Sequence, residues 1–176
     1  MRRVMISAAL AALLAACSPP AQQDTTTPTP TPRPIVVACN NVAPDASKQV
    51  RVDDEVAIAA AAADLRGGRI APGTYDLTSA RRIGAATGWS GTHAVALEVS
   101  ENPTGGVTFN WAGAAPGGGV DTWTATFTDA PQPRLSYSCG RTGDVDADFS
   151  ANTTQLELRL PDGADGRLNM VFAKRG

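Results

Sequence analysis

Three aspartates are the residues of this sequence whose spacing could support metal chemistry. Asp144, Asp146 and Asp148 alternate along the chain, and alternate carboxylates can bind a hard cation when the chain curls into a loop. Phe149 stands where such a calcium-binding loop requires glycine, and Gln155 stands where the bidentate glutamate would be. On a flat strand the three carboxylates would share one solvent-exposed face. We therefore expect no metal site.

His93 is the one histidine, and its surroundings do not indicate catalysis. Its neighbours Ala94 and Glu98 supply neither a nucleophile nor a set of metal ligands. No serine lies in a Gly-x-Ser-x-Gly pattern. We expect His93 to be an exposed strand residue. The chain is predicted to have no catalytic residue and no cofactor, and not to be an enzyme.

The chemistry that the sequence supports best is acylation of Cys17. A basic start leads into an apolar run of about a dozen residues, too short to span a membrane and typical of a secretory signal. Leu14-Ala15-Ala16-Cys17 then resembles the bacterial lipobox. The resemblance implies that residues 1–16 are a lipoprotein signal peptide and that the mature chain begins with a diacylglycerol-modified, N-acylated Cys17. The alternative is an ordinary cleavable signal followed by cysteine.

The resemblance also implies a location. Two or more acyl chains anchor a protein stably in a membrane. Ser18 follows the cysteine where Asp would signal retention, which favours the outer membrane of the cell envelope. The first partner that we expect is therefore membrane lipid.

Cys39 and Cys139 have only each other to pair with once Cys17 carries lipid. The compartment beyond the cytoplasmic membrane is oxidising, so we predict a disulfide between them. In the chain-entropy model a loop of about 100 residues gives at most roughly 4.7 kcal/mol of stabilisation. Two free buried thiols are the alternative. A zinc site is disfavoured because no other Cys or His lies at ligand spacing.

Charge and composition bound what the mature chain can do. The sequence has 15 basic and 17 acidic side chains, and loss of Arg2 and Arg3 with the signal leaves a net charge of about −4. Nucleic-acid binding needs a basic face and is not expected.

Residues 17–34 form the lipidated N-terminus and a Thr/Pro-rich tether, which favours extended polyproline-II structure. Residues 35–176 form one domain.

Most of that domain alternates with a period of two, which is typical of half-buried strands. The inward positions that we predict are Tyr75 and Leu77; Val95, Leu97 and Val99; Val107, Phe109 and Trp111; Trp123, Ala125 and Phe127; Leu135, Tyr137 and Cys139; a weaker run from Val145 to Phe149; Leu156, Leu158 and Leu160; and Leu168, Met170 and Phe172.

About eight short strands with even spacing predict an all-β fold, an antiparallel up-and-down barrel whose closure removes exposed edges. The segment before them, Cys39–Gly68, is ambiguous. Asp53-Asp54-Glu55 could start a short helix that Ala59–Ala63 would extend and Gly67-Gly68 would stop, and we favour this helix. Val56 and Ile58 alternate with alanine, so an extended run is the alternative.

The start of the first long strand carries a resemblance. The segment from Gly67 to Thr78, GGRIAPGTYDLT, resembles the opening strand of a group of small bacterial lipoproteins. Gly73-Thr74-Tyr75 is similar to the Gly-x-Trp that opens lipocalin-like barrels, with tyrosine in place of tryptophan. Lipocalins place a basic residue near the last strand over that ring, and the resemblance points to Lys174 or Arg175 for this role.

Aromatic residues are the candidate binding side chains. Trp111, Trp123 and Tyr75 sit at inward positions, where they either fill a core or line a cavity. Trp89 lies between strands and could be an exposed loop aromatic. We therefore expect a non-enzymatic, membrane-anchored domain that binds a small apolar ligand or an envelope protein. The alternative is a structural or assembly lipoprotein with a filled core and no small-molecule site.

Overall fold

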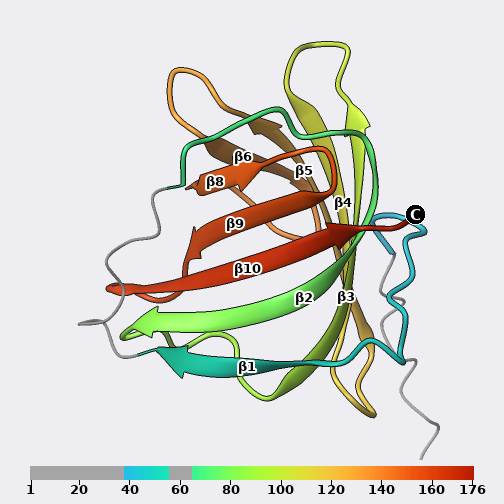
Figure 1. Ribbon diagram of the computed structural model, residues 1–176, viewed down its shortest axis with the longest axis vertical. Coiled ribbons are helices and arrows are strands. Elements are labelled where there is room, and N and C mark those ends of the chain that lie inside the picture. The colour runs from blue at the N-terminus through green and yellow to red at the C-terminus, as the bar shows by residue number, and fades with distance from the viewer. Residues whose placement is uncertain (1–37, 56–64) are drawn as a thin grey trace, which may run out of the picture. The chain divides into compact units, whose positions relative to one another are not determined.

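The computed structural model of the protein describes residues 38–55 and 65–176, which form an all-β domain (Figure 1). The predicted all-β class is confirmed. Cys17, the signal peptide and the Thr/Pro tether lie outside the described residues. None of the described residues forms a helix long and apolar enough to cross a bilayer.

The strands are β1 (Val50–Glu55), β2 (Gly73–Gly84), β3 (Thr92–Glu101), β4 (Val107–Ala114), β5 (Val120–Thr128), β6 (Arg134–Cys139), β7 (Asp144–Asp146), β8 (Asp148–Ala151), β9 (Gln155–Pro161) and β10 (Gly166–Lys174).

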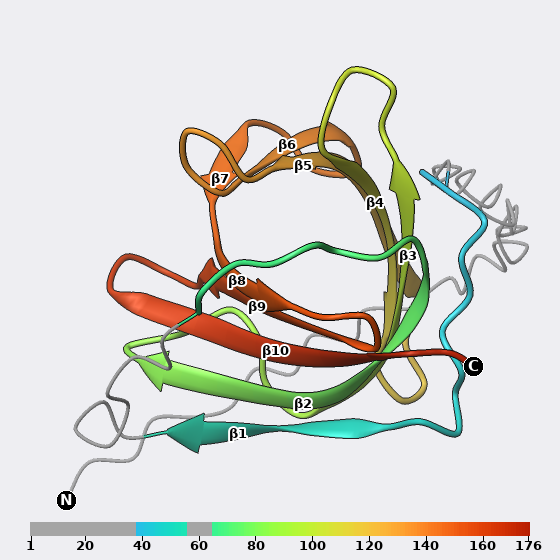
Figure 2. The same cartoon turned by 45° about the horizontal axis from the view of Figure 1, so that its top comes forward.

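All ten strands belong to one mostly antiparallel sheet, in the order β7-β6-β5-β4-β3-β1-β2-β10-β9-β8. The sheet curls so that β5, β6 and β7 lie across from β8, β9 and β10 (Figure 2). The chain passes from β7 to β8 through Ala147 alone, so the predicted run from Val145 to Phe149 is split between the two ends of the strand order. Strand order is therefore open at β7 and β8.

A helix starting at Asp53 is a wrong prediction, because Asp53 and Asp54 lie in β1. This strand pairs in parallel with the second half of β2, where Val52 is opposite Ala80, and antiparallel with β3, where Val50 is opposite His93. Hydrogen bonding on both sides and burial of Val52 hold the segment extended. The extended alternative therefore applies to β1, and Ala59–Ala63 lie outside the described residues.

One core fills the inside of the curl. The predicted inward rows of β2, β3, β4, β5, β9 and β10 are buried, except for Val107 at the start of β4, and Leu97, Phe109 and Phe172 are fully buried. Val107 and Tyr137 are partly buried and pack against this core. The period-two pattern was sufficient to place these side chains because successive strand residues point to opposite faces.

A β-bulge in β6 separates two residues that the pattern places on one face. Tyr137 pairs with Ala125, but Cys139 pairs with Thr124, so β6 contains one extra residue at this point. Tyr137 faces the core, whereas Cys139 faces outward, where Cys39 lies. The prediction that Tyr137 and Cys139 share an inward row is therefore wrong for Cys139.

One end of the curl is crossed by residues 65–72, which we call the plug. Its Gly67 N–H donates to the Phe149 carbonyl at 2.8 Å, and the Gly67 carbonyl accepts from the Ala151 N–H at 3.0 Å. These bonds cover the outer edge of β8, which would otherwise be free to pair with another chain. Gly68 has φ +124°, and a Cβ there would lie 2.3 Å from the Ala151 carbonyl oxygen, so the close approach requires glycine.

The outer face of the sheet is crossed by residues 39–49, which we call the strap. The predicted disulfide between Cys39 and Cys139 is confirmed and ties the strap to β6 across a sequence separation of 100. The Asn40 amide donates to the carbonyl oxygens of Trp111 at 3.1 Å and Trp123 at 2.9 Å. The strap is thereby fixed to β4 and β5 as well.

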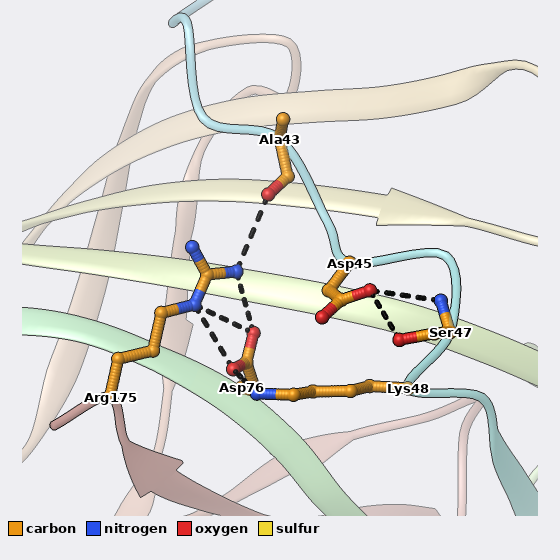
Figure 3. Close-up of polar contacts among 6 residues, drawn as sticks. All are labelled: Ala43, Asp45, Ser47, Lys48, Asp76 and Arg175. Carbon is orange, nitrogen blue, oxygen red and sulfur yellow. Dashed lines mark hydrogen bonds and ion pairs between the residues drawn. The ribbon is translucent and has the colours of Figure 1, made fainter.

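A buried carboxylate holds the other end of the strap (Figure 3). Asp76 is 4% exposed on the outer face of β2. Arg175 binds both of its oxygens at 2.7–3.0 Å, and Lys48 of the strap binds one at 2.7 Å. The hydrogen bonds from Arg175, with those from Lys48, hold the pKa of Asp76 below its usual value although burial acts in the opposite direction. The strap and the C-terminus are therefore joined through Asp76.

Candidate functional site

Two of the candidate aromatic residues meet inside the curl because their strands are neighbours. Trp111 of β4 and Trp123 of β5 are directly paired in register, and both point inward. Their rings stack with centroids 5.2 Å apart and an interplanar angle of 12°. Such aromatic pairs add stability beyond the area they bury. The two indoles therefore form one rigid wall.

Trp89 joins this wall from the loop between β2 and β3. The Asp162 carboxylate accepts hydrogen bonds from the N–H of Gly88 at 2.6 Å and of Trp89 at 3.4 Å, which holds the loop over the end of the sheet. The Trp89 ring lies 5.6 Å from that of Trp111. Trp89 is half-buried against the core, so an exposed loop aromatic is a wrong expectation.

His93 stacks on the outer side of Trp89, with ring centroids 4.2 Å apart and an angle of 8°. Its Nε2 lies 2.7 Å from the Ser90 carbonyl oxygen. His93 is a strand residue of β3, as predicted, and it is half-buried rather than fully exposed. The side chain supports the loop that carries Trp89, and this local role explains its position.

Tyr137 and Arg141 complete the group on the β6 side. Tyr137 meets the edge of Trp123 at 5.2 Å, and the Arg141 guanidinium carbon lies 5.8 Å from the Trp123 ring centroid. Arg141 also forms an ion pair with Asp121 at 3.3 Å. A cation over aromatic faces is attracted by their negative quadrupole. Sequence reasoning missed Arg141, since nothing in the pattern of an isolated loop arginine points to a ring.

These side chains surround a cavity of about 250 Å³ at what we call the tryptophan end of the curl, defined by Trp89, Trp111 and Trp123. Its volume is slightly below that of usual small-molecule pockets, which start at roughly 300 Å³, so it suits only a compact ligand. Its walls are largely apolar and aromatic. The lining residues are Gly88, Trp89, Trp111, Trp123, Arg141, Leu160, Pro161, Asp162, Leu168 and Met170.

The indole nitrogens of Trp111 and Trp123 are buried and have no hydrogen-bond partner among the described residues. Buried donors are nearly always bonded, and an unmet one costs roughly 1–3 kcal/mol. The Trp111 nitrogen lies against Gly113, where an added Cβ would approach it to 2.9 Å. Two of the residues that line this cavity therefore carry a buried N–H donor without a hydrogen-bond partner, which is energetically costly.

Tyr75, the fourth candidate residue, is not part of this cavity. It is fully buried, and its hydroxyl donates to the Ala71 carbonyl of the plug at 2.6 Å. Burial raises the pKa of the Tyr75 phenol. Arg175, which the lipocalin resemblance offered as a cover for this ring, binds Asp76 instead. Tyr75 fastens the plug.

A second hollow, of about 310 Å³, lies at the opposite end of the curl beside the plug. We call this the phenylalanine end, defined by Phe109, Phe127 and Phe149. Ile70 and Phe127 are among its lining, and its rim carries charges of both signs, including an Arg69–Glu101 pair at 3.8 Å. Within the described residues, no buried polar atom lacking a partner lines it. The tryptophan end is therefore the better candidate despite its smaller volume.

A third, polar hollow of about 670 Å³ lies on the outer face beside the strap. Its polar side chains bind one another: Asn110 donates to Glu98 at 3.1 Å, and Thr124 donates to Asn110 at 2.9 Å. Because these groups are already partnered, they give no reason to infer a ligand.

The three alternating aspartates are divided between two strands. Asp144 and Asp146 lie in β7 beside Arg134, at 3.8 Å and 2.8 Å, whereas Asp148 begins β8. The shared flat-strand face that the sequence indicated is therefore wrong for Asp148. In the part of the chain that the structure describes, no three His, Cys, Asp or Glu side chains are grouped as metal ligands.

Comparison with known proteins adds little. No protein-family model matches this sequence, and no curated protein matches it. Among solved structures, the chain is similar to a de novo designed fluorescence-activating β-barrel, with 11% sequence identity and a TM-score of 0.40, over 60% of this chain and 94% of that chain. We draw no functional conclusion from a likeness at this level.

Proposed function

We propose that this protein is a lipid-anchored envelope protein whose β domain binds a small apolar ligand at the tryptophan end, without catalysing a reaction. The observation that carries this proposal is the pair of buried, unpartnered indole N–H groups of Trp111 and Trp123 beside a cavity. Because neither nitrogen is open to the cavity, a ligand with an acceptor atom would satisfy these costly donors through a small shift of an indole ring on binding.

The chemistry of the lining supports binding without catalysis. Asp162 is its one carboxylate, and that group accepts hydrogen bonds from two backbone N–H groups. A general base must be able to take a proton from a substrate, and Asp162 is committed to holding the loop. The remaining lining residues, apart from Arg141, are apolar or aromatic.

For the fold, we propose a lipocalin-like, up-and-down barrel that the curled sheet forms incompletely. Neighbouring strands from β3 to β7 follow one another in sequence, as do β8, β9 and β10, which supports this reading. The plug lies along the outer edge of β8. Barrels of about eight strands are either filled by side chains or hold one small ligand, and here a small cavity remains at one end of the filled interior.

For the anchor, we propose acylation of Cys17 and residence in the outer membrane, with residues 17–34 as the tether. The support is the Leu14-Ala15-Ala16-Cys17 sequence and the following Ser18. Growth with a palmitate analogue tests it: the protein should be labelled and Cys17→Ala should not be. Labelling of the variant would contradict the anchor.

Native mass spectrometry of the full-length protein tests the binding proposal. We expect a co-purifying small-molecule adduct that is lost on unfolding and reduced by Trp123→Ala. A bare monomer, from cells and media of varied composition, would contradict the proposal. That result would favour the alternative, a structural or assembly lipoprotein with a filled core.

A further inference from the structure

The polar groups at the tryptophan end offer donors and little else. Trp111 and Trp123 each carry an indole N–H that is buried in the cavity wall, and Arg141 contributes a guanidinium at the cavity. An indole can only donate, and a guanidinium has five N–H donors and no acceptor. The ion pair of Arg141 with Asp121 uses one of its terminal nitrogens. The complementary ligand therefore needs acceptor atoms.

The one carboxylate in the lining already accepts hydrogen bonds. Both Asp162 oxygens accept backbone hydrogen bonds, from Gly88 at 2.6 Å and from Trp89 at 3.4 Å. These bonds offset the negative charge that Asp162 would present to an anion. A ligand that donates hydrogen bonds, such as an amine, would have to compete with the loop for this group.

The walls determine the rest of the ligand. Leu160, Leu168 and Met170 face the three indoles across about 250 Å³. Aromatic and thioether walls favour a compact hydrocarbon or aromatic body. An anion in such a place is costly unless it is both paired and hydrogen-bonded, and the Arg141 guanidinium can supply both the charge and the N–H donors.

We infer that the ligand is a small apolar carboxylate, with its ring or hydrocarbon body among the tryptophans and its carboxylate toward Arg141, where a small shift of an indole ring on binding brings its buried N–H to the carboxylate. This inference rests on the proposed function and specifies the ligand class of the same site. Arg141 is held over the Trp123 and Tyr137 rings, 5.8 Å and 5.9 Å from their centroids, so its charge is kept at the cavity.

Isothermal titration of the full-length protein with benzoate and benzamide tests the ligand class. The two probes have nearly the same shape, but benzamide is neutral and carries donors. We expect benzoate to bind about tenfold more tightly, because charge-assisted hydrogen bonds are stronger than neutral ones. Arg141→Gln should remove this preference. Arg134→Gln, which alters an arginine paired with Asp146 outside the cavity, should retain it.

The outcomes separate this inference from the function on which it rests. Equal or tighter binding of benzamide would overturn the carboxylate while leaving a ligand-binding cavity. Binding of neither probe by a protein that carries an adduct in its native mass spectrum would do the same. Binding of neither probe by an adduct-free protein would overturn both. A benzoate preference that survives Arg141→Gln would overturn the role of Arg141 and with it the proposed pose.

Discussion

At the phenylalanine end of the curled sheet, aromatic rings pack on one another, and none of the described rings there has a buried polar atom without a hydrogen-bond partner. At the tryptophan end, rings of similar size surround a cavity, and two of them have a buried indole N–H without a partner. Phe109 and Phe127 stack 5.3 Å apart, and Phe149 meets Phe127 at 5.0 Å. Trp111 and Trp123 stack in the same way at 5.2 Å. The difference is the indole N–H, which an apolar interior does not satisfy.

The same strands build both ends, so the contrast comes from side chains. β4 contributes Phe109 to one end and Trp111, two residues later, to the other. β5 contributes Trp123 and Phe127 in the reverse direction. The plug also supplies a hydrogen-bond acceptor for the buried tyrosine: the Ala71 carbonyl oxygen accepts from the Tyr75 hydroxyl. We propose that the phenylalanine end serves stability and the tryptophan end serves binding.

The largest expected effect comes from emptying the phenylalanine end. Phe127→Ala removes a ring that is 2% exposed and contacts two others, and it should lower the free energy of unfolding by about 3–5 kcal/mol. Urea unfolding measures it. Benzoate affinity, measured below the transition, should not change. A loss of less than about 1 kcal/mol would mean that this end is not the stable one.

Breaking the outer-face network should destabilise the domain without touching either end. Asp76→Asn leaves Lys48 and Arg175 without their carboxylate and should cost roughly 2 kcal/mol, whereas Asp53→Asn, at an exposed pair, should cost little. The fluorescence spectrum of the folded tryptophans should be unchanged.

The same network has a pH dependence. The folded-state pKa of Asp76 is lowered, so its contribution is present above the unfolded value of about 3.9 and is lost as pH falls through the folded-state pKa. Stability of the native protein should therefore fall more steeply below about pH 4 than that of Asp76→Asn. Parallel curves for the two proteins would contradict the role of Asp76.

A smaller effect should appear at the glycine beside the indole. Gly113→Ala places a methyl group 2.9 Å from the Trp111 nitrogen and should cost about 1.5 kcal/mol while shifting tryptophan fluorescence. Gly119→Ala is the matched control, because nothing lies within 4 Å of its Cβ. Equal stability of the two variants would show that Trp111 does not lie against Gly113.

The smallest expected change in stability follows removal of an unmet donor. Trp111→Phe loses ring contacts but also removes a buried N–H that has no acceptor, so the net cost should be below about 1 kcal/mol. Benzoate binding should nevertheless weaken about tenfold. A large loss of stability with unchanged binding would assign the tryptophan end a structural role and reverse the comparison.

Much of this arrangement follows from the sequence, because strand alternation is local. The inward rows of β2, β3, β4, β5, β9 and β10 were predictable. The Cys39–Cys139 pairing was predictable too, from the expectation that Cys17 is acylated and that the chain is exported to an oxidising compartment. Three of the four candidate binding residues are brought together, and Tyr75 is not.

The rest depends on contacts between distant segments. The bulge that turns Cys139 outward, the hold of Asp162 on the Trp89 loop and the position of Arg141 over Trp123 each join residues far apart in the chain. The acidic residues from Asp53, which favoured a helix start, lie in a strand because β1 is hydrogen-bonded to strands on both sides. Periodicity reports none of these contacts.

The indole N–H resonances test the central claim most directly. The sequence has three tryptophans, so a ¹⁵N–¹H spectrum of the full-length protein should show three indole signals, assigned by Trp→Phe substitution. Titration with benzoate should move the Trp111 and Trp123 signals downfield as each donor gains a carboxylate acceptor, with a much smaller change for Trp89. Signals of Trp111 and Trp123 that stay fixed while benzoate saturates the protein would contradict the account.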